Sequence, residues 1–200
     1  MPKHKRGLLI VLSGPSGVGK STIVKRLRKI NPRLKMSVSC TTRPPRLGEA
    51  NKRDYFFISK EAFTEKVKNG EFLEWAEVHG RYYGTPREFI EENLKKNNVV
   101  LLEVDVQGAG TIKDWLYKAR LRKSAVFVFI IPPSVDMLAF RLKRRKTESS
   151  ELLNYRLRAA IAELQVMEKY DYIVVNDQVE HAARKIQAII NVEKERVLLN

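Results

Sequence analysis

The feature that most constrains this chain is a glycine-rich loop between an aliphatic run and a helical pattern. The segment Gly14-Pro-Ser-Gly-Val-Gly-Lys-Ser21 matches G-x-x-x-x-G-K-[ST] and follows the aliphatic run Leu8 to Leu12. A helical pattern from Lys20 to Lys29 comes directly after it. Glycines allow successive backbone N–H groups to surround a phosphate, and the helix N-terminus adds a favourable dipole. The motif predicts a nucleoside triphosphate site, although it does not specify a reaction.

Each residue of this loop has a predicted place around the triphosphate. Lys20 is expected to reach the β and γ phosphates, and the Ser21 hydroxyl is expected to coordinate Mg²⁺. The rest of the predicted ATP-binding loop is Gly14, Pro15, Ser16, Gly17, Val18 and Gly19. The alternative is a glycine-rich turn that binds nothing. We disfavour it because strand, loop and helix follow one another in register.

Buried strands that alternate with helices predict a parallel α/β sheet covered on both faces. The other aliphatic runs are Val99 to Val104, Ala125 to Ile131 and Tyr172 to Val175, and the other helical patterns are Pro86 to Lys96, Ser134 to Arg144, Glu151 to Lys169 and Glu180 to Val197. The segment from Ser37 to Tyr83 breaks this rhythm with short alternating stretches and one short helical pattern around Glu61 to Lys68. We therefore expect a small antiparallel or mixed lobe inserted into the α/β core.

Composition excludes several classes of protein. The chain is 44% hydrophobic and 30% charged, which suits a folded core, and no apolar run approaches the roughly 20 residues of a membrane span. Its one cysteine, Cys40, can form no internal disulfide. The basic start is not followed by a signal-peptide cleavage site, so we expect a cytoplasmic protein with no membrane partner.

The net charge leaves the partner open. The 38 lysines and arginines exceed the 23 aspartates and glutamates by 15. Such a surplus fits a nucleic-acid partner, a small phosphorylated substrate or a solvated lysine-rich surface. The positions of the arginines must separate these possibilities.

A second candidate anion site lies downstream of the loop. Arg43 and Arg46 are three residues apart and are stiffened by the intervening Pro44 and Pro45. Guanidinium groups can hold a phosphate in two directions at once. On residue types alone, an anion clamp and a solvated turn are equally good interpretations.

The order of motifs along the whole chain resembles the guanylate kinase family. The matching stretches are Gly14 to Ser21, Ser39 to Glu49, Asp54-Tyr55, Phe72 to Trp75, Tyr82 to Thr85, Glu103 to Gly108, Pro132 to Ser134 and Val175 to Asp177. The resemblance implies a P-loop core, an inserted lobe that binds a nucleoside monophosphate, and a mobile lid. It implies one domain over 1–200, with the core over about 1–36 and 86–200, the lobe over about 37–85 and the lid over about 141–156.

The resemblance also assigns roles within the lobe. The residues that match family positions around the GMP phosphate are Arg43, Arg46, Tyr55 and Tyr83, and those that match positions around the guanine are Ser39, Glu74, Thr85 and Asp105. Glu74 makes chemical sense there, because one carboxylate can accept both the N1–H and the N2–H₂ of guanine. Adenine lacks both donors, and a site built on such hydrogen bonds rejects it.

Two acids at the end of the second aliphatic run extend this set. Glu103 and Asp105 are two residues apart, so both point to the same face near the carboxyl end of a strand, where ligands bind in open α/β sheets. We expect them to contact the nucleotide or to position waters of the magnesium ion. The alternative is a strand-end salt-bridge pair.

A basic segment completes the predicted catalytic set. Arg141 and Arg145 are four residues apart on one helix face, and Arg156 lies in the next helix. The resemblance implies that these three arginines contact the transferring phosphates, together with Lys20 and Arg43. One departure is Lys146, where the family often has glycine. Asn176 and Asp177 fall where the family contacts the ATP adenine, although Asn-Asp after a strand is also an ordinary turn.

The implied activity is magnesium-dependent transfer of the ATP γ-phosphate to GMP, and also to dGMP, without a covalent enzyme intermediate. A binding module that recognises phosphorylated peptides through Arg43 and Arg46 is the competing interpretation. We expect no nucleic-acid partner, because the chain lacks an aromatic-basic recognition motif. The closing amphipathic helix has enough length for a subunit contact in a homo-oligomer.

Overall fold

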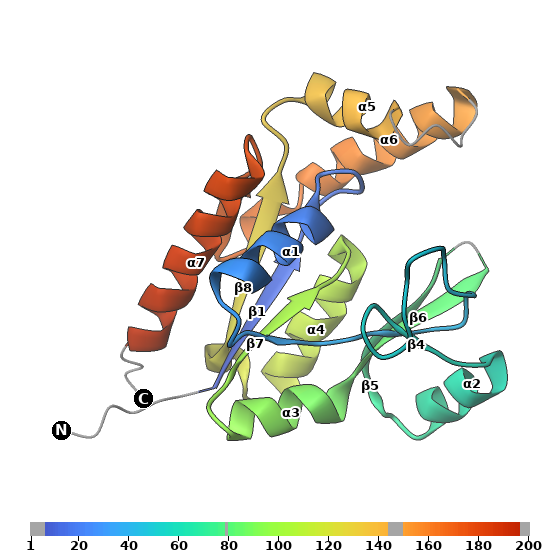
Figure 1. Cartoon of the computed structure of the whole chain (residues 1–200), viewed down its shortest axis with the longest axis vertical. Helices are drawn as coiled ribbons and strands as arrows, with labels where there is room; N and C mark the ends of the chain where they lie inside the picture. Colours follow the sequence, from blue (N-terminus) through green and yellow to red (C-terminus); the bar gives the residue numbers. More distant parts are fainter. Residues whose placement is uncertain (1–6, 79, 144–149, 197–200) are drawn as a thin grey trace.

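The protein is described by a computed structural model that covers residues 7–78, 80–143 and 150–196. Within these ranges the larger sheet has five parallel strands in the order β2-β7-β1-β8-β9 (Figure 1). Its strands are β1 (Leu8–Ser13), β2 (Lys35–Met36), β7 (Val99–Glu103), β8 (Ala125–Ile131) and β9 (Tyr172–Val175). The prediction of a parallel α/β sheet is confirmed.

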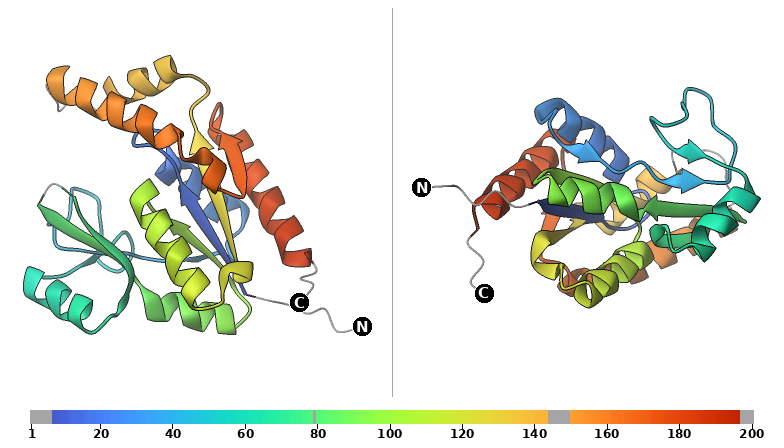
Figure 2. Two further views of the ribbon diagram at one scale, coloured as in Figure 1. Left: turned by 180° about the vertical axis from the view of Figure 1, so that it is seen from behind. Right: turned by 90° about the horizontal axis from the view of Figure 1, so that it is seen from below.

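Helices cover both faces of this sheet. The helices α1 (Lys20–Ile30) and α7 (Val179–Glu195) pack on one face, and α3 (Arg87–Lys95) and α4 (Val106–Lys118) pack on the other. Figure 2 shows these layers from below, with the sheet edge-on between α4 and the pair α1 and α7. In the described ranges, no helix combines the length and apolarity that crossing a membrane would need.

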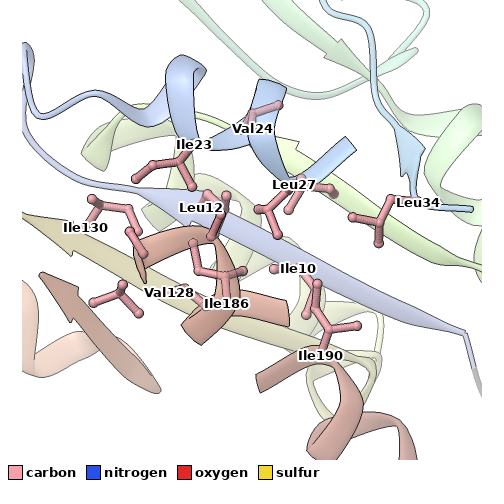
Figure 3. Close-up of a cluster of buried hydrophobic side chains, with 14 of the residues drawn as sticks. Ile10, Leu12, Ile23, Val24, Leu27, Leu34, Val128, Ile130, Ile186 and Ile190 are labelled. Carbon is pink, nitrogen blue, oxygen red and sulfur yellow. The ribbon is translucent and has the colours of Figure 1, made fainter. Parts of the chain in front are cut away.

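The central strand β1 is continuously aliphatic because it is buried on both faces of the sheet. Leu8, Ile10 and Leu12 pack into the cluster beneath α1 and α7, whereas Leu9 and Val11 pack into the cluster beneath α3 and α4. All five side chains are fully buried. Successive side chains of a strand point to opposite faces, so a strand covered on both faces has no polar position. Figure 3 shows Ile10 and Leu12 among side chains from α1 and α7.

The inserted segment forms a separate four-stranded sheet in the order β4-β3-β6-β5. Its strands are β3 (Cys40–Thr41), β4 (Phe56–Phe57), β5 (Phe72–Val78) and β6 (Arg81–Pro86), with α2 (Lys60–Lys68) beside them. The β3 and β4 strands are parallel, and the other pairs are antiparallel, so the sheet is mixed. This sheet and α2 stand to one side of the larger sheet in Figure 1.

Two further helices, α5 (Val135–Lys143) and α6 (Ser150–Leu164), lie beyond the carboxyl ends of the parallel strands (Figure 1). The helix predicted from Glu151 to Lys169 ends at Leu164, and Met167–Lys169 forms a separate 3₁₀ turn. A second 3₁₀ turn, Arg122–Ser124, precedes β8.

The helix α4 is absent from the sequence prediction. Gly108 and Gly110 lie in its first half, and glycine lowers helix propensity by about 1 kcal/mol relative to alanine. A side chain at Gly108 would begin 3.1 Å from a carboxylate oxygen of Glu74. The glycine that obscures the helix therefore makes room for a residue of the candidate site.

Packing against the sheet, rather than helix propensity, should stabilise α7. Ile186 is fully buried in the cluster shown in Figure 3, whereas Val192 on the same helix is 64% exposed. Ile186→Ala should lower the free energy of unfolding by about 2–5 kcal/mol, measured by urea denaturation. The control Val192→Ala should change it by less than about 0.5 kcal/mol. Equal effects of the two substitutions would contradict this packing.

Candidate functional site

The phosphate loop connects β1 to α1 at the carboxyl edge of the larger sheet. Gly14 and Gly17 have φ angles of +145° and +85°, and Gly19, which precedes α1, has φ +97°. A Cβ at Gly14 would lie 2.3 Å from the Ile130 carbonyl oxygen of β8, so this position excludes any side chain. Lys20 folds back over the loop, and its Nζ donates to the Gly14 carbonyl at 2.6 Å.

Two predicted nucleotide contacts hold the loop from within the protein. The Val18 carbonyl accepts hydrogen bonds from Arg141 Nη1 at 3.0 Å and from Asn176 Nδ2 at 2.7 Å. Arg141 Nη2 also donates to the Asn176 carbonyl at 3.0 Å. Asn176 is only 2% exposed. The structure therefore directs the Asn176 carboxamide at the loop, and Arg141 connects the loop to the end of β9.

Asp177, the other residue predicted beside the adenine, is exposed. Its Oδ1 accepts the Gln178 backbone N–H at 2.7 Å, and its Oδ2 lies 3.7 Å from Nδ1 of His181 in the first turn of α7. The hydrogen bond to Gln178 keeps the pKa of Asp177 below its usual range, and His181 adds to this effect. These local contacts are those of an acid at the start of a helix.

The helix α6 contacts the loop at Ser16. Arg156 Nη2 donates to Ser16 Oγ at 2.9 Å, and the Ser16 backbone N–H donates to Glu163 Oε2 at 3.3 Å. Burial raises the pKa of Glu163, although the Ser16 N–H and Lys20 oppose this. Sequence reasoning missed Glu163. The available signal is that it lies seven residues after Arg156, on the same helix face.

An oxygen pair lies where the loop enters α1. The Ser21 hydroxyl donates to Glu103 Oε1 at 2.6 Å, which joins the predicted magnesium ligand to one of the two predicted strand-end acids. Hydroxyl and carboxylate oxygens are suitable ligands or water acceptors for Mg²⁺. These two residues therefore fit a magnesium ion that is bound together with a nucleotide.

The two arginines of the inserted segment are organised by Glu49. Arg43 Nη1 and Nη2 donate to the two oxygens of Glu49 at 2.7 and 2.8 Å, and Glu49 also accepts the Arg46 backbone N–H at 2.8 Å. The Arg43 guanidinium lies 5.0 Å from the centre of the Tyr55 ring and 5.6 Å from that of Phe57. The predicted phosphate clamp is thus a guanidinium between a carboxylate and two rings.

The Arg43 and Glu49 pair is electrostatically strong. The paired Arg43 guanidinium, helped by the Arg46 N–H, lowers the pKa of Glu49 to about 2, and Glu49 raises the pKa of Arg43. Glu49 ends the family-like stretch Ser39 to Glu49, but no role was predicted for it. Its position six residues after Arg43 and three after Arg46 is the pattern that could have assigned one.

The two predicted tyrosines lie beside this clamp. The rings of Tyr55 and Tyr83 meet edge to face, with centroids 6.0 Å apart. Burial, followed by the charge of Glu103, raises the pKa of Tyr55. Because Glu103 belongs to β7, Tyr55 lies within electrostatic reach of the larger sheet. Arg46 is exposed, so the predicted phosphate-binding cluster is open to solvent on the side of this residue.

Three of the four predicted guanine contacts come together. The Thr85 hydroxyl donates to Glu74 Oε1 at 2.6 Å, and Asp105 Oδ1 accepts the Gly108 N–H at 2.7 Å as the cap of α4. A Cβ at Gly108 would lie within 3.2 Å of both carboxylates. The fourth, Ser39, directly precedes β3, and its carbonyl accepts the Phe56 N–H at 2.9 Å.

The Glu74 carboxylate has the most perturbed acidity of this set. Burial raises its pKa to about 7, with a further contribution from Asp105 and an opposing one from the Thr85 hydroxyl. A largely buried acid with one hydrogen-bond donor has remaining acceptor capacity. Its chemistry therefore suits a ligand that presents N–H groups.

Arg145 and Lys146, predicted at the lid, lie outside the described residues. Most of the remaining predicted residues form three clusters: the loop with Ser21, Glu103, Arg141, Arg156 and Asn176; the Arg43 clamp with its tyrosines; and the Glu74 carboxylate with Thr85 and Asp105. A glycine-rich loop with lysine and serine, at the carboxyl edge of a parallel sheet, defines a P-loop nucleotide-binding protein.

Comparison with known proteins gives the family. The guanylate kinase family model matches residues 6–193. A guanylate kinase of Caldanaerobacter subterraneus subsp. tengcongensis is 49% identical over 98% of this chain and 93% of that protein, and one of Clostridium tetani is 47% identical over 96% and 89%. The crystal structure of guanylate kinase from Anaplasma phagocytophilum matches with a TM-score of 0.78 at 35% identity, over 96% of this chain and 89% of that one. The chain belongs to the guanylate kinase family.

The raised pKa of Glu74 makes folding stability depend on pH. Between its ordinary value of about 4.5 and about 7, the folded protein retains a proton that the unfolded chain releases. The wild type should therefore lose stability relative to Glu74→Gln as pH rises through this window, by up to about 3 kcal/mol above pH 7. Urea denaturation at a series of pH values between 4.5 and 8 measures this difference.

The matched control is Glu77→Gln, which removes an exposed carboxylate from the same strand. A stability difference between wild type and Glu74→Gln that stays constant across the pH series would show that Glu74 is not a buried acid.

Proposed function

We propose that this protein phosphorylates GMP, transferring the γ-phosphate of ATP and releasing ADP and GDP. The main support is the largely buried Glu74 carboxylate, which accepts the Thr85 hydroxyl, in a chain that belongs to the guanylate kinase family. A second phosphate clamp at Arg43, separate from the phosphate loop, supports a reaction between two phosphorylated substrates. We propose that the acceptor lobe covers about 37–85, the core about 1–36 and 86–200, and the lid about 141–156.

The donor end of the reaction is assigned to the phosphate loop. We assign the triphosphate to the backbone of Gly14 to Gly19, with Lys20 released from the Gly14 carbonyl to contact the β and γ phosphates. Ser21, with Glu103 as its partner, would hold the magnesium ion, which neutralises charge on the phosphate oxygens when bound. The proposed adenine contacts are Asp177, which is exposed, and Asn176. Because Asn176 is buried, it can contact adenine only through its backbone or the edge of its carboxamide.

The acceptor phosphate is assigned to the cluster of Arg43, Arg46, Tyr55 and Tyr83. Glu49 fixes the Arg43 guanidinium through two of its nitrogens. A guanidinium that is already oriented loses less side-chain entropy when a phosphate binds. Arg46 is exposed and can turn toward the ligand, so the clamp combines one fixed and one adjustable arginine.

The guanine is assigned to Ser39, Glu74, Thr85 and Asp105, and Glu103 is the further residue proposed to bind GMP. The ionised Glu74 carboxylate accepts the N1–H and N2–H₂ of guanine, and the Thr85 or Ser39 hydroxyl donates to O6. The 2′-hydroxyl of the ribose is contacted by none of these groups, so dGMP should also be accepted. The same buried acceptor discriminates against AMP, because adenine would leave it without a donor.

Phosphoryl transfer between these two ends requires positioning and charge neutralisation. The proposed catalytic groups are Lys20, Arg43, Arg141, Arg145 and Arg156. Arginines aimed at the transferring phosphate stabilise charge that develops in the transition state. Arg156 contacts Ser16 of the phosphate loop, which supports its proposed role beside the triphosphate. We propose ATP and GMP as partners in the cytoplasm, with no nucleic acid, and leave α7 as a candidate homo-oligomer contact.

The acceptor preference tests the proposed function. ADP production from MgATP should be fast with GMP, measurable with dGMP, and at least about 10³-fold lower in kcat/KM with AMP, CMP or UMP. Glu74→Gln should reduce the ratio of kcat/KM for GMP to kcat/KM for AMP, because an amide presents one acceptor oxygen and adds a donor. Equal turnover of AMP and GMP by the wild type would overturn the assignment of Glu74.

The two phosphate sites should be separable by calorimetry. Lys20→Ala should abolish phosphoryl transfer, because Lys20 contacts the triphosphate. It should leave the dissociation constant of GMP within about threefold of the wild-type value. Arg43→Ala should raise the dissociation constant of GMP by at least about tenfold, since a charge-assisted hydrogen bond contributes about 1.5–3 kcal/mol. It should leave ATP binding nearly unchanged. If both substitutions weaken the same nucleotide equally, one of the two clamps is misplaced.

A further inference from the structure

A cavity lies between the two sheets, apart from the three clusters described above. It has a volume of about 500 Å³ and is lined by the end of α1, by β2, by the Lys52–Arg53 turn and by Phe89 of α3. A second cavity, of about 580 Å³, shares Met36, Val38, Lys52 and Phe89 with it and extends to Cys40. We call these two together the hinge cavity, because they flank the chain where it crosses from β2 to β3.

The hinge cavity opens on the side of this crossing that faces away from the proposed guanine contacts. Met36, Val38 and Cys40 line it, whereas Ser37 and Ser39 do not. Alternate side chains of an extended segment point to opposite sides. Ser39 belongs to the proposed guanine site, so a ligand in the hinge cavity would not compete with GMP for this strand.

Unpaired cations surround the first part of the cavity. Its charged lining consists of Arg28, Lys35, Lys52 and Arg53, and it includes no Asp or Glu. Arg53 is paired with Asp54 at 2.8 Å. Among the described residues, the side chains of Arg28, Lys35 and Lys52 take part in no hydrogen bond or ion pair. Three cations without a counter-charge therefore line the first part of the cavity, whereas the lining of the second part includes Glu88 and Glu92.

The sequence explains why no acid lines the first part of the cavity. Residues 1–48 contain 12 lysines and arginines and no aspartate or glutamate. The local surplus is therefore most of the net charge of +15. A concave surface lined by charges of one sign concentrates counter-ions. Of these twelve cations, Lys20, Arg43 and Arg46 belong to the two proposed substrate clamps, whereas Arg28 and Lys35 line the cavity.

The walls of the cavity are apolar. Met36, Val38 and Leu34 line it beside Phe89, which is 36% exposed. A free phosphate would use the cations and leave this surface uncovered, whereas an aromatic ring would cover it. We propose that the hinge cavity binds a small ligand that carries a phosphate group on an aromatic ring. The phosphate lies on Arg28, Lys35 and Lys52, and the ring lies against Phe89 and Met36.

Such a ligand would contact both bodies that the crossing connects. Arg28, Lys35 and Phe89 belong to elements of the larger sheet and its covering helices, whereas Lys52 belongs to the inserted segment. A ligand that touches both sides of a connection binds one relative arrangement better than another, and it shifts the population of that arrangement. The hinge cavity is therefore a site from which the lobe can be controlled without occupying the GMP site.

Calorimetry with 1-naphthyl phosphate tests the proposal. The titration is made on the full chain with a saturating bisubstrate ligand, in which adenosine and guanosine are joined by five phosphates, so that both substrate sites are filled. We expect one molecule to bind. Inorganic phosphate and 1-naphthol should each bind at least tenfold more weakly, because each supplies only half of the recognised chemistry.

Two double variants with the same change in charge complete the test. The double variant Arg28→Ala, Lys35→Ala should bind 1-naphthyl phosphate at least tenfold more weakly than the wild type. Lys29→Ala with Arg33→Ala removes two exposed cations from the same helix end that do not line the cavity, and it should change the affinity by less than threefold. Absence of binding, or equal weakening by the two pairs, would overturn the proposal. Failure of the bisubstrate ligand to bind would instead contradict the proposed function.

Discussion

The burial of β1 between two layers of helices determines where the phosphate loop lies. Its side chains alternate between the cluster under α1 and α7 and the cluster under α3 and α4, so the strand can neither slip nor turn over without exposing aliphatic surface. The chain must then leave the sheet at Gly14, where the Ile130 carbonyl of β8 leaves no room for a Cβ. The loop, α1 and the bonds that hold the Val18 carbonyl all follow from this exit point.

Carboxylates do much of the organising in a site that is built for anions. Glu49 orients Arg43, Glu163 accepts a loop N–H, and Glu103 accepts the Ser21 hydroxyl. Each of these acids contacts a group that a bound nucleotide would otherwise engage: a guanidinium or a loop N–H that would donate to a phosphate, or a hydroxyl oxygen that would coordinate magnesium. Glu74 differs from them, because its burial raises its pKa and its nearest partner is a neutral hydroxyl. This contrast separates acids that position the machinery from the acid that we propose reads the base.

Much of this organisation could be predicted from the sequence, because it depends on local pattern. The aliphatic runs predicted β8 and β9 with their observed bounds, and the glycine motif located the loop. The helix α4 was missed because its glycines serve a tertiary requirement, the space for Glu74 and Asp105. The contact of Glu163 with Ser16 and the burial of Asn176 depend on how α6 and β9 pack against the loop. The spacing of Glu163 from Arg156 indicates a shared helix face but not this partner. Local propensity carries no information about such contacts.

The central claim is that one phosphoryl group passes directly between the phosphate loop and the Arg43 clamp. The stereochemistry at phosphorus tests it most directly. An ATP analogue whose γ-thiophosphate is made chiral with oxygen isotopes would be used to phosphorylate GMP, and the configuration of the product would be determined. A single in-line displacement inverts the configuration, which is the result this account predicts. Retention would show two successive displacements through a phosphorylated enzyme group, and it would contradict direct transfer.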